Sequence, residues 1–164
     1  MSMQHGIGVK EVFYCPMTRG EYNDYRRWSY PAGEDQLVPG YLVEYKDGGE
    51  KNHPDHAGYI SWSPADVFDN AYRPTSGMSF GLAIEAMKRG HRVARKGWNG
   101  RGICIFLEKG AEGSHGDLKL ICYGPFIAID TTGLITNNPD APKSIVPWLA
   151  SQTDMLSDDW VVIS

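Results

Sequence analysis

Residues 147–160 read PWLASQTDMLSDDW, with Trp148 and Trp160 enclosing a run of short polar side chains. A segment needed only for packing shows apolar residues at a regular period, and this one does not. Its hydroxyl, amide and carboxylate groups favour a capped turn or short helix before a last strand. A flat indole beside short, fixed donors and acceptors suits a nucleobase and a ribose, so the stretch is predicted to form one wall of a binding site.

The segments that precede this stretch predict an antiparallel sheet with one helix. Ser79 is placed to cap a helix whose apolar residues recur at helical spacing and which stops near Gly90. Asn99-Gly100 is typical of a two-residue hairpin turn. Strand-like stretches follow the helix at residues 92–96, 103–107, 118–123, 126–131, 145–148 and 160–163, of which 118–123 and 126–131 are expected to be partners.

The first half of the chain predicts a second small module. Thr18 can cap a helix to about residue 28, and Ser63-Pro64 can open another, with Ser63 as the cap. Strands are expected at residues 9–14, 41–45 and 59–62, and residues 73–77 look like a linker. The predicted fold class is α+β, with modules at 1–75 and 77–164, each an antiparallel β-sheet with a helix packed on one face.

Composition excludes several classes of protein. The chain has 164 residues, 41% hydrophobic and 22% charged, which favours globular domains over disorder. Its net charge is -4: residues 1–75 hold 7 Lys/Arg and 11 Asp/Glu (7 − 11 = -4), and the remainder hold 9 of each. Such a balance argues against a partner that is long nucleic acid. No apolar run approaches membrane-spanning length and no secretory signal is visible, so a cytoplasmic protein is expected.

The ionisable residues show no catalytic or metal-binding pattern. The three cysteines are widely spaced and suggest no disulfide framework, and Cys104 and Cys122 are expected to be buried strand thiols. His53 and His56 flank Pro54 with no further ligand cluster, so a solvated loop is predicted rather than a metal site. Neither GxSxG nor a glycine-rich phosphate loop is present. Asp158-Asp159 could supply acid–base carboxylates, although capping or solvation is favoured.

The segment Arg95–Arg101, RKGWNGR, is the second candidate for ligand binding. A tryptophan beside a hairpin tip is difficult to bury, and stacking on an exposed indole contributes about 1–3 kcal/mol per base. A guanidinium such as that of Arg95 can bind phosphate in bidentate fashion. The alternative is Trp98 folded over the sheet edge among solvated cations. Equally, the polar residues 151–154 could only cap a turn, and Phe80 could belong to the core.

Three ordered segments resemble the Thoeris anti-defense 2 family of small phage and prophage proteins. They are MSFGLAIEAMKRG at 78–90, VARKGWNG at 93–100, and PWLASQTDML at 147–156 followed by Asp159-Trp160. The resemblance implies a molecular sponge that binds cyclic ADP-ribose isomers (glycocyclic ADP-ribose), made by Thoeris immune sensors, without cleaving them. Some members also take up cyclic dinucleotides. The family forms homo-oligomers, understood to be tetramers, with pockets between protomers.

The resemblance also implies which residues bind the ligand. The expected residues are Trp98, Asn99, Trp148, Ser151, Thr153 and Asp154, with Phe80 and Arg95 as additions. Indoles would stack on adenine, Asp and Ser would meet ribose hydroxyls, and Arg would meet the pyrophosphate. No cofactor, metal or catalytic residue is expected, and the protein is expected to act in the cytoplasm of the bacterial host.

The chain departs from the family pattern in two places. Residues 1–76 are additional and resemble a module common in phage proteins, with no activity assigned to it, and the segment 136–143 is longer than a compact turn. The sequence also allows two other functions. One is a metal-dependent nucleotide-processing enzyme that uses Asp154, Asp158 or Asp159, and the other is a phage structural or host-interaction module whose tryptophans form a protein interface.

Overall fold

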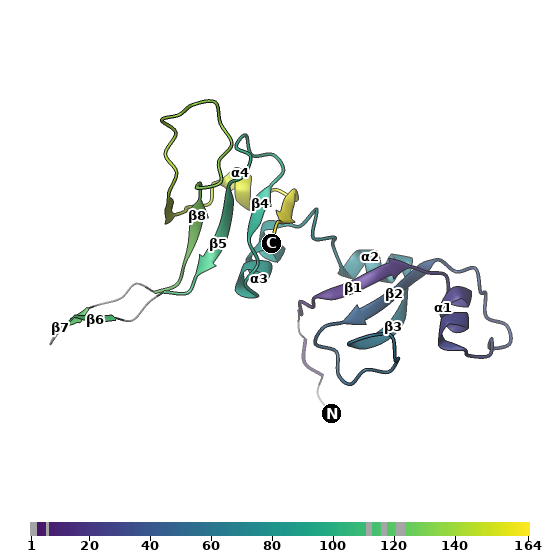
Figure 1. Ribbon diagram of the computed structural model, residues 1–164. Coiled ribbons are helices and arrows are strands. Elements are labelled where there is room, and N and C mark those ends of the chain that lie inside the picture. The colour runs from purple at the N-terminus through teal and green to yellow at the C-terminus, as the bar shows by residue number, and fades with distance from the viewer. Residues whose placement is uncertain (1–2, 6, 111–112, 116–117, 121–123) are drawn as a thin grey trace. The chain divides into compact units, whose positions relative to one another are not determined.

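The computed structural model describes residues 3–5, 7–110, 113–115, 118–120 and 124–164, and the chain forms two compact units, Met1–Tyr72 and Arg73–Ser164 (Figure 1). Both units combine an antiparallel sheet with packed helices, which confirms the α+β fold class. Within the described part of the chain, no helix has the length and apolar character needed to cross a membrane.

The N-terminal unit contains a three-stranded sheet of order β1-β2-β3, formed by Val12–Pro16, Gly40–Tyr45 and Tyr59–Pro64. Helix α1, Arg19–Arg26, begins with a capping box: the Thr18 hydroxyl accepts from the Glu21 amide while the Glu21 carboxylate accepts from the Thr18 amide. Helix α2, Ala65–Ala71, follows β3 directly. The predicted cap of α2 is wrong by one residue, because Ser63 pairs within β3 and Pro64 precedes the helix without a side-chain cap.

Helices pack on both faces of this small sheet. Tyr22 of α1 is buried against Leu42 and Ile60, whereas Phe68 of α2 lies 4.5 Å, between ring centroids, from Tyr41. Because Tyr41 and Leu42 are neighbours in β2, their side chains point to opposite faces. The two helices therefore cover opposite faces, where the sequence predicted a helix on one.

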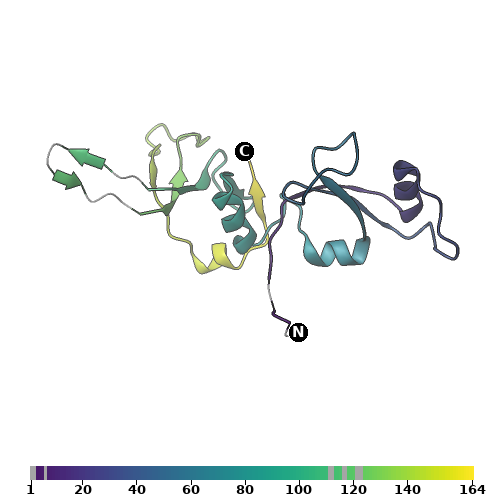
Figure 2. The same cartoon turned by 90° about the horizontal axis from the view of Figure 1, so that it is seen from below.

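The C-terminal unit is built around a five-stranded antiparallel sheet of order β10-β4-β5-β8-β9. Its strands are β4 Val93–Arg95, β5 Cys104–Glu108, β8 Phe126–Asp130, β9 Ile145–Pro147 and β10 Trp160–Val162. Helix α3, Phe80–Lys88, is capped by the Ser79 hydroxyl as predicted, and it lies next to the short helix α4, Gln152–Met155 (Figure 2). The core between helix and sheet consists of Met78, Ala83, Ala86, Met87, Val93, Ile105 and Trp160.

Two expectations for the C-terminal unit need correction. The Asn99-Gly100 turn is wrong, because β4 and β5 share the register pair Val93↔Ile105 and are joined by the longer connection 96–103. Leu118–Leu120 is a strand (β7), but its partner is β6, Gly113–His115, while β8 pairs with β5. The 73–77 segment, expected as a linker, lies at the boundary between the two units, and its Thr75 carbonyl accepts from the Val162 amide. Cys104 is buried in β5 as predicted, and Cys122 lies outside the described residues.

Candidate ligand-binding site

Four aromatic side chains of the C-terminal unit form one cluster centred on Trp160. Trp160 is 0% exposed, and its ring centroid lies 5.3 Å from Phe80, 5.4 Å from Trp98 and 6.1 Å from Trp148. Trp98 and Trp148 contact each other at 6.0 Å in an edge-to-face arrangement, which is a favoured geometry for aromatic pairs. The outer three rings are half-buried, so each keeps part of its surface available to a ligand.

Different elements bring these four rings together. Phe80 is the first residue of α3, Trp148 follows β9, and Trp160 opens β10. Trp160 is fixed in position by its backbone, which exchanges two hydrogen bonds with Met78 at 2.8 and 3.1 Å. Trp98 stands on the β4–β5 connection. The cluster therefore joins segments that are far apart in the sequence.

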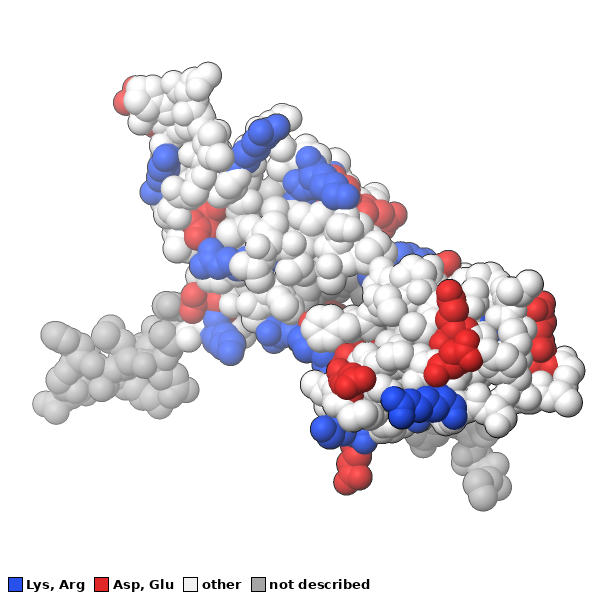
Figure 3. Space-filling model, turned by 45° about the vertical axis from the view of Figure 1, so that its right-hand side comes forward, with Lys and Arg blue, Asp and Glu red and all other residues white. Residues whose placement is uncertain are grey.

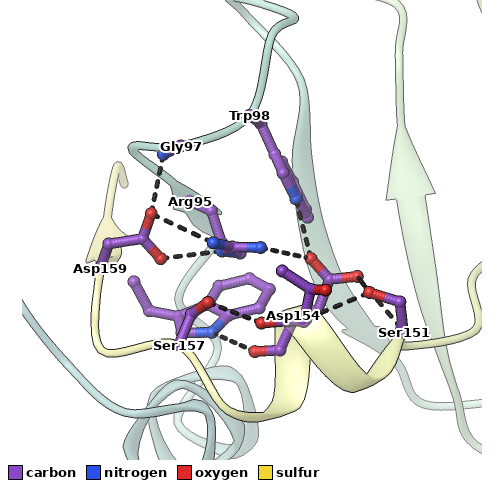
Figure 4. A network of polar contacts seen from close by, with 9 residues as sticks. Arg95, Gly97, Trp98, Ser151, Asp154, Ser157 and Asp159 are labelled. Atoms are coloured by element: carbon purple, nitrogen blue, oxygen red, sulfur yellow. Dashed lines mark hydrogen bonds and ion pairs between the residues drawn. The ribbon is translucent and has the colours of Figure 1, made fainter.

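Asp154 is the centre of a polar network that contacts the Trp98 indole (Figure 4). Its Oδ1 accepts from Arg95 Nη1 at 2.9 Å and from the Trp98 indole Nε1 at 3.1 Å. Its Oδ2 accepts from the Ser151 hydroxyl at 2.6 Å and the Ser151 amide at 3.1 Å, which completes a capping box at α4. The Asp154 carbonyl also accepts from the Trp160 indole at 3.0 Å. Every carboxylate oxygen of Asp154 thus has two donors.

Arg95 joins Asp154 to a second carboxylate. Its Nε donates to Asp159 Oδ1 at 2.8 Å and its Nη2 lies 3.4 Å from Asp159 Oδ2. The side chains of Arg95, Asp154 and Asp159 are 12%, 13% and 31% exposed. One cation against two carboxylates leaves the network with a formal charge of 1 − 2 = -1.

The hydrogen bonds determine the ionisation of this network. Burial alone would raise the pKa of Asp154, but the hydrogen bonds from Ser151, Arg95 and Trp98 outweigh it and hold that pKa well below its usual range. The hydrogen bond from Arg95, followed by that from the Gly97 amide, likewise lowers the pKa of Asp159, and the two carboxylates raise the pKa of Arg95. All three groups therefore stay charged near neutral pH.

Six of the eight predicted site residues come together in this region: Phe80, Arg95, Trp98, Trp148, Ser151 and Asp154. Asn99 and Thr153 are exposed on the β4–β5 connection and on α4, and the structure does not place their side chains within the cluster. Trp160, the buried centre of the cluster, and Asp159, the second partner of Arg95, belong to the segment predicted as one wall of the site but were not among the eight expected ligand contacts. Their position directly after the polar segment was the available signal.

Asp154 and Asp159 both accept hydrogen bonds from fixed donors that lower their pKa values, so both carboxylates are weak bases. Among the residues that the structure describes, no group of three or more His, Cys, Asp or Glu could hold a metal ion. On the face shown in Figure 3, Lys and Arg side chains are separated by uncharged surface and by Asp and Glu, and they form no continuous basic strip.

The N-terminal unit contains a separate polar cluster formed by His53, His56, Tyr25 and Glu44. The expectation that the two histidines lie in a solvated loop is wrong. His56 Nδ1 lies 2.7 Å from Glu44 Oε2 and its Nε2 lies 2.9 Å from the Tyr25 hydroxyl. The His53 ring stacks on Tyr25 with centroids 4.5 Å apart. Both imidazoles are largely buried, because Glu44 also accepts from the amides of Ala57 and Gly58 and so folds the loop onto the sheet.

The segment that contains the aromatic cluster matches a known protein family. Residues 78–163 match the model of a family described as the Thoeris anti-defense 2-like domain. A curated protein from Bacillus phage SP01, named Thoeris anti-defense 2, is 38% identical over 87 residues, which cover 53% of this chain and 96% of that protein. The family match lies within the C-terminal unit, Arg73–Ser164.

Proposed function

The chain belongs to the Thoeris anti-defense 2-like family, and we propose that it counteracts Thoeris defence by sequestering a cyclic ADP-ribose-type signal such as glycocyclic ADP-ribose. The ligand is held intact, in the cytoplasm of the infected bacterium, so that the immune effector is not switched on. Cyclic dinucleotides are further candidate ligands. The observation that carries the proposal is the half-buried Trp98–Trp148 pair above a fixed polar network, within the family-matched residues.

The aromatic cluster supplies the stacking surface in this proposal. Trp98 and Trp148 each present part of an indole, and Trp160 supports both from below as a buried platform. Stacking of a base on such a ring contributes about 1–3 kcal/mol. Phe80 at the start of α3 widens the same surface. We therefore expect adenine to bind here.

The polar residues divide into two roles. Asn99 and Thr153 are exposed and are available to ribose hydroxyl groups, whereas the Ser151 hydroxyl donates to Asp154 Oδ2 and accepts from the Asp154 amide, so it can offer a ribose only a remaining acceptor position. The saturated carboxylate of Asp154 favours a supporting role, in which it orients the Trp98 indole instead of binding the sugar. The carboxylate partners of Arg95 favour the same for its guanidinium, so we expect the pyrophosphate to meet the exposed cations Lys96 and Arg101 on the β4–β5 connection.

An exposed apolar surface beside the site supports assembly into a homo-oligomer, a tetramer by family resemblance. Leu149 and Leu156, on either side of α4, are 92% and 80% exposed. The edge strand β9 adds Ile145 and Val146, which are also exposed. Exposed apolar residues can mark interaction sites, and Val146 and Leu149 lie within two residues of Trp148 in the chain, which suits a pocket that a second copy completes.

Titration calorimetry with glycocyclic ADP-ribose tests the proposal. The wild-type chain is expected to bind, and Trp148→Ala is expected to weaken binding at least about tenfold, the equivalent of one lost stacking contact. Trp28→Ala is the matched control, because Trp28 is an exposed indole of the N-terminal unit. Unchanged affinity in the Trp148 variant, or no binding by the wild type, would contradict the proposal.

The competing enzyme function predicts a different outcome. A metal-dependent nucleotide-processing enzyme would convert the nucleotide on long incubation with Mg²⁺ or Mn²⁺, whereas a sponge leaves it unchanged. Chromatography of the nucleotide after incubation separates the two functions. If the chain neither binds nor converts any nucleotide, the interaction-module function becomes the better account of its tryptophans.

A further inference from the structure

We infer that Asp159 is a positioning residue of the binding site, which fixes the Trp98 indole through Arg95 and the backbone of the 95–98 turn. This inference rests on the proposed function and deepens it, because it identifies what keeps the stacking surface in place. Asp159 itself is not a ligand contact. Its effect on affinity is expected to pass through Trp98.

Asp159 holds three consecutive residues ahead of Trp98. Its side chain accepts from Arg95 Nε at 2.8 Å and from the Gly97 amide at 2.8 Å. Its backbone carbonyl accepts from the Lys96 amide at 3.1 Å. The Trp98 amide then donates to the Arg95 carbonyl at 3.3 Å and closes the turn. The path of the backbone into Trp98 is therefore set by one aspartate.

The indole ring is fixed from the opposite side by the same network. Trp98 Nε1 donates to Asp154 Oδ1 at 3.1 Å, and that oxygen also accepts from Arg95 Nη1 at 2.9 Å. Arg95 thus connects the atom that anchors the ring to the atoms that anchor the backbone, as Figure 4 shows. Loss of the Asp159 carboxylate removes one of the two carboxylates that orient the Arg95 guanidinium. The backbone before Trp98 and the contact at its indole nitrogen are then both held less firmly.

Gly97 provides independent evidence that the turn and Asp159 are fitted to each other. A Cβ added at Gly97 would lie 2.8 Å from Asp159 Oδ2 and 3.3 Å from Arg95 Nη2. Both distances are tighter than ordinary van der Waals contact, so even alanine would push the carboxylate away from the amide that it accepts from. The close approach explains why the position next to Trp98 lacks a side chain.

The preceding residue offers a matched control. Asp158 has the same chemistry as Asp159 and is exposed, and the structure gives its carboxylate no part in the network around Arg95. Asp158→Asn and Asp159→Asn therefore remove the same charge at adjacent positions. A general electrostatic effect on the ligand would appear in both variants, and a positioning effect only in the second.

The first test measures the position of Trp98 without ligand. Indole N–H resonances are recorded on ¹⁵N-tryptophan-labelled full chain, and Trp98→Phe assigns the Trp98 signal. Asp159→Asn is expected to shift or broaden that signal, and Asp158→Asn to leave it in place. An unmoved Trp98 signal in Asp159→Asn would overturn the inference whether or not any nucleotide binds.

The second test measures whether Asp159 acts through Trp98. Asp159→Asn is expected to weaken binding of glycocyclic ADP-ribose about tenfold, the loss typical of a broken charge-assisted hydrogen bond. In a Trp98→Phe background the same substitution should change affinity by less than about twofold, because residues that act as one unit are not additive. Additive losses would overturn the positioning role. A wild type that binds no nucleotide would instead defeat the proposed function, and with it the claim on affinity.

A third variant protects the test against misfolding. Should Asp159→Asn melt below the assay temperature, Gly97→Ala keeps every charge and disturbs the same contact by one methyl group. It is expected to shift the Trp98 signal and to weaken binding in the same direction. A Gly97→Ala chain with an unshifted Trp98 signal and wild-type affinity would overturn the inference.

Discussion

The two units of the chain each contain a carboxylate that accepts several hydrogen bonds, but the two carboxylates have different partners. In the C-terminal unit Asp154 is paired with Arg95, a permanent cation, and with the Trp98 indole. In the N-terminal unit Glu44 accepts from His56 and from two backbone amides. The first network supports an aromatic surface, while the second fastens a loop to a sheet. A polar cluster therefore points to a binding site only when the side chains that it holds in place form a surface suited to a ligand.

The largest expected effect comes from the aromatic residues that each unit buries. Trp160→Ala should lower the free energy of unfolding of the C-terminal unit by about 3–5 kcal/mol, because a fully buried tryptophan leaves a large cavity. Phe68→Ala should cost the N-terminal unit a similar amount. Native-state hydrogen exchange measures each unit separately. If the amides of the C-terminal unit exchanged equally slowly in the wild type and in Trp160→Ala, Trp160 would not be the stabilising centre of this unit.

Substitution of Asp154 and of Glu44 should show that the two polar networks contribute differently to the stability of their units. Asp154→Asn is expected to destabilise the C-terminal unit by about 2–3 kcal/mol, since it breaks a largely buried ion pair and several hydrogen bonds. Glu44→Gln should cost the N-terminal unit about 1–2 kcal/mol, because the amide still accepts from the backbone. Denaturant unfolding followed by hydrogen exchange measures the loss in free energy of unfolding for each variant. A larger loss for Glu44→Gln than for Asp154→Asn would contradict the comparison between the two networks.

The response to acid should also differ between the units. The pKa values of Asp154 and Asp159 are lowered in the fold, and hydrogen bonds from Thr132 and Arg92 lower the pKa of Asp130 to about 2. A lowered folded-state pKa contributes stability that is present above the unfolded value near 3.8 and is lost as pH falls towards the folded value. The C-terminal unit should therefore lose stability steeply below pH of about 4.

Among the residues that the structure describes, the N-terminal unit has two carboxylates with a lowered pKa, Glu44 and the exposed Glu21, which accepts from Thr18. There the hydrogen bond from His56, followed by that from the Gly58 amide, lowers the pKa of Glu44. The same sign applies, so this unit also loses stability in acid, but with a shallower slope. Hydrogen exchange at several pH values between about 5 and 2 compares the slopes. A steeper loss in the N-terminal unit would contradict the assignment of the stronger ionic network to the C-terminal one.

The smallest effect on stability is expected at the exposed apolar surface. Leu156→Ser should change the free energy of unfolding by less than about 0.5 kcal/mol, because Leu156 is 80% exposed. If a second copy covers this surface, the same substitution should lower the mass of the particle measured by light scattering. Val67→Ser in the N-terminal unit, also exposed, is the control and should leave the mass unchanged. An unaltered mass for Leu156→Ser would exclude this surface from assembly.

Local signals in the sequence predicted most of the elements. Thr18 and Ser79 cap helices as expected, because a cap depends on residues within one turn. The β2–β3 hairpin was likewise predicted from the residue types of its strands. Asn99-Gly100 failed as a turn, since the register of β4 and β5 leaves a longer connection between them, and tertiary pairing decides that register.

The sequence predicted which aromatic and polar residues lie together, because most of them are concentrated in two short segments, but it did not predict their contacts. Ligand binding by these residues stays a prediction. The pair Arg95–Asp159 joins residues 64 positions apart, so no local pattern could assign Arg95 to a carboxylate instead of to a phosphate. The complete burial of Trp160 could not be predicted either, because it depends on Met78, Phe80 and Trp98 arriving from other elements.

The most direct test of the central claim is recovery of the ligand from the protein. The chain is saturated with glycocyclic ADP-ribose, freed of unbound nucleotide, denatured by heat, and the released nucleotide is quantified by mass spectrometry. Intact glycocyclic ADP-ribose is expected from the wild type and little from Trp148→Ala. Release of a degraded nucleotide from the wild type, or of none, would contradict the proposed sequestration.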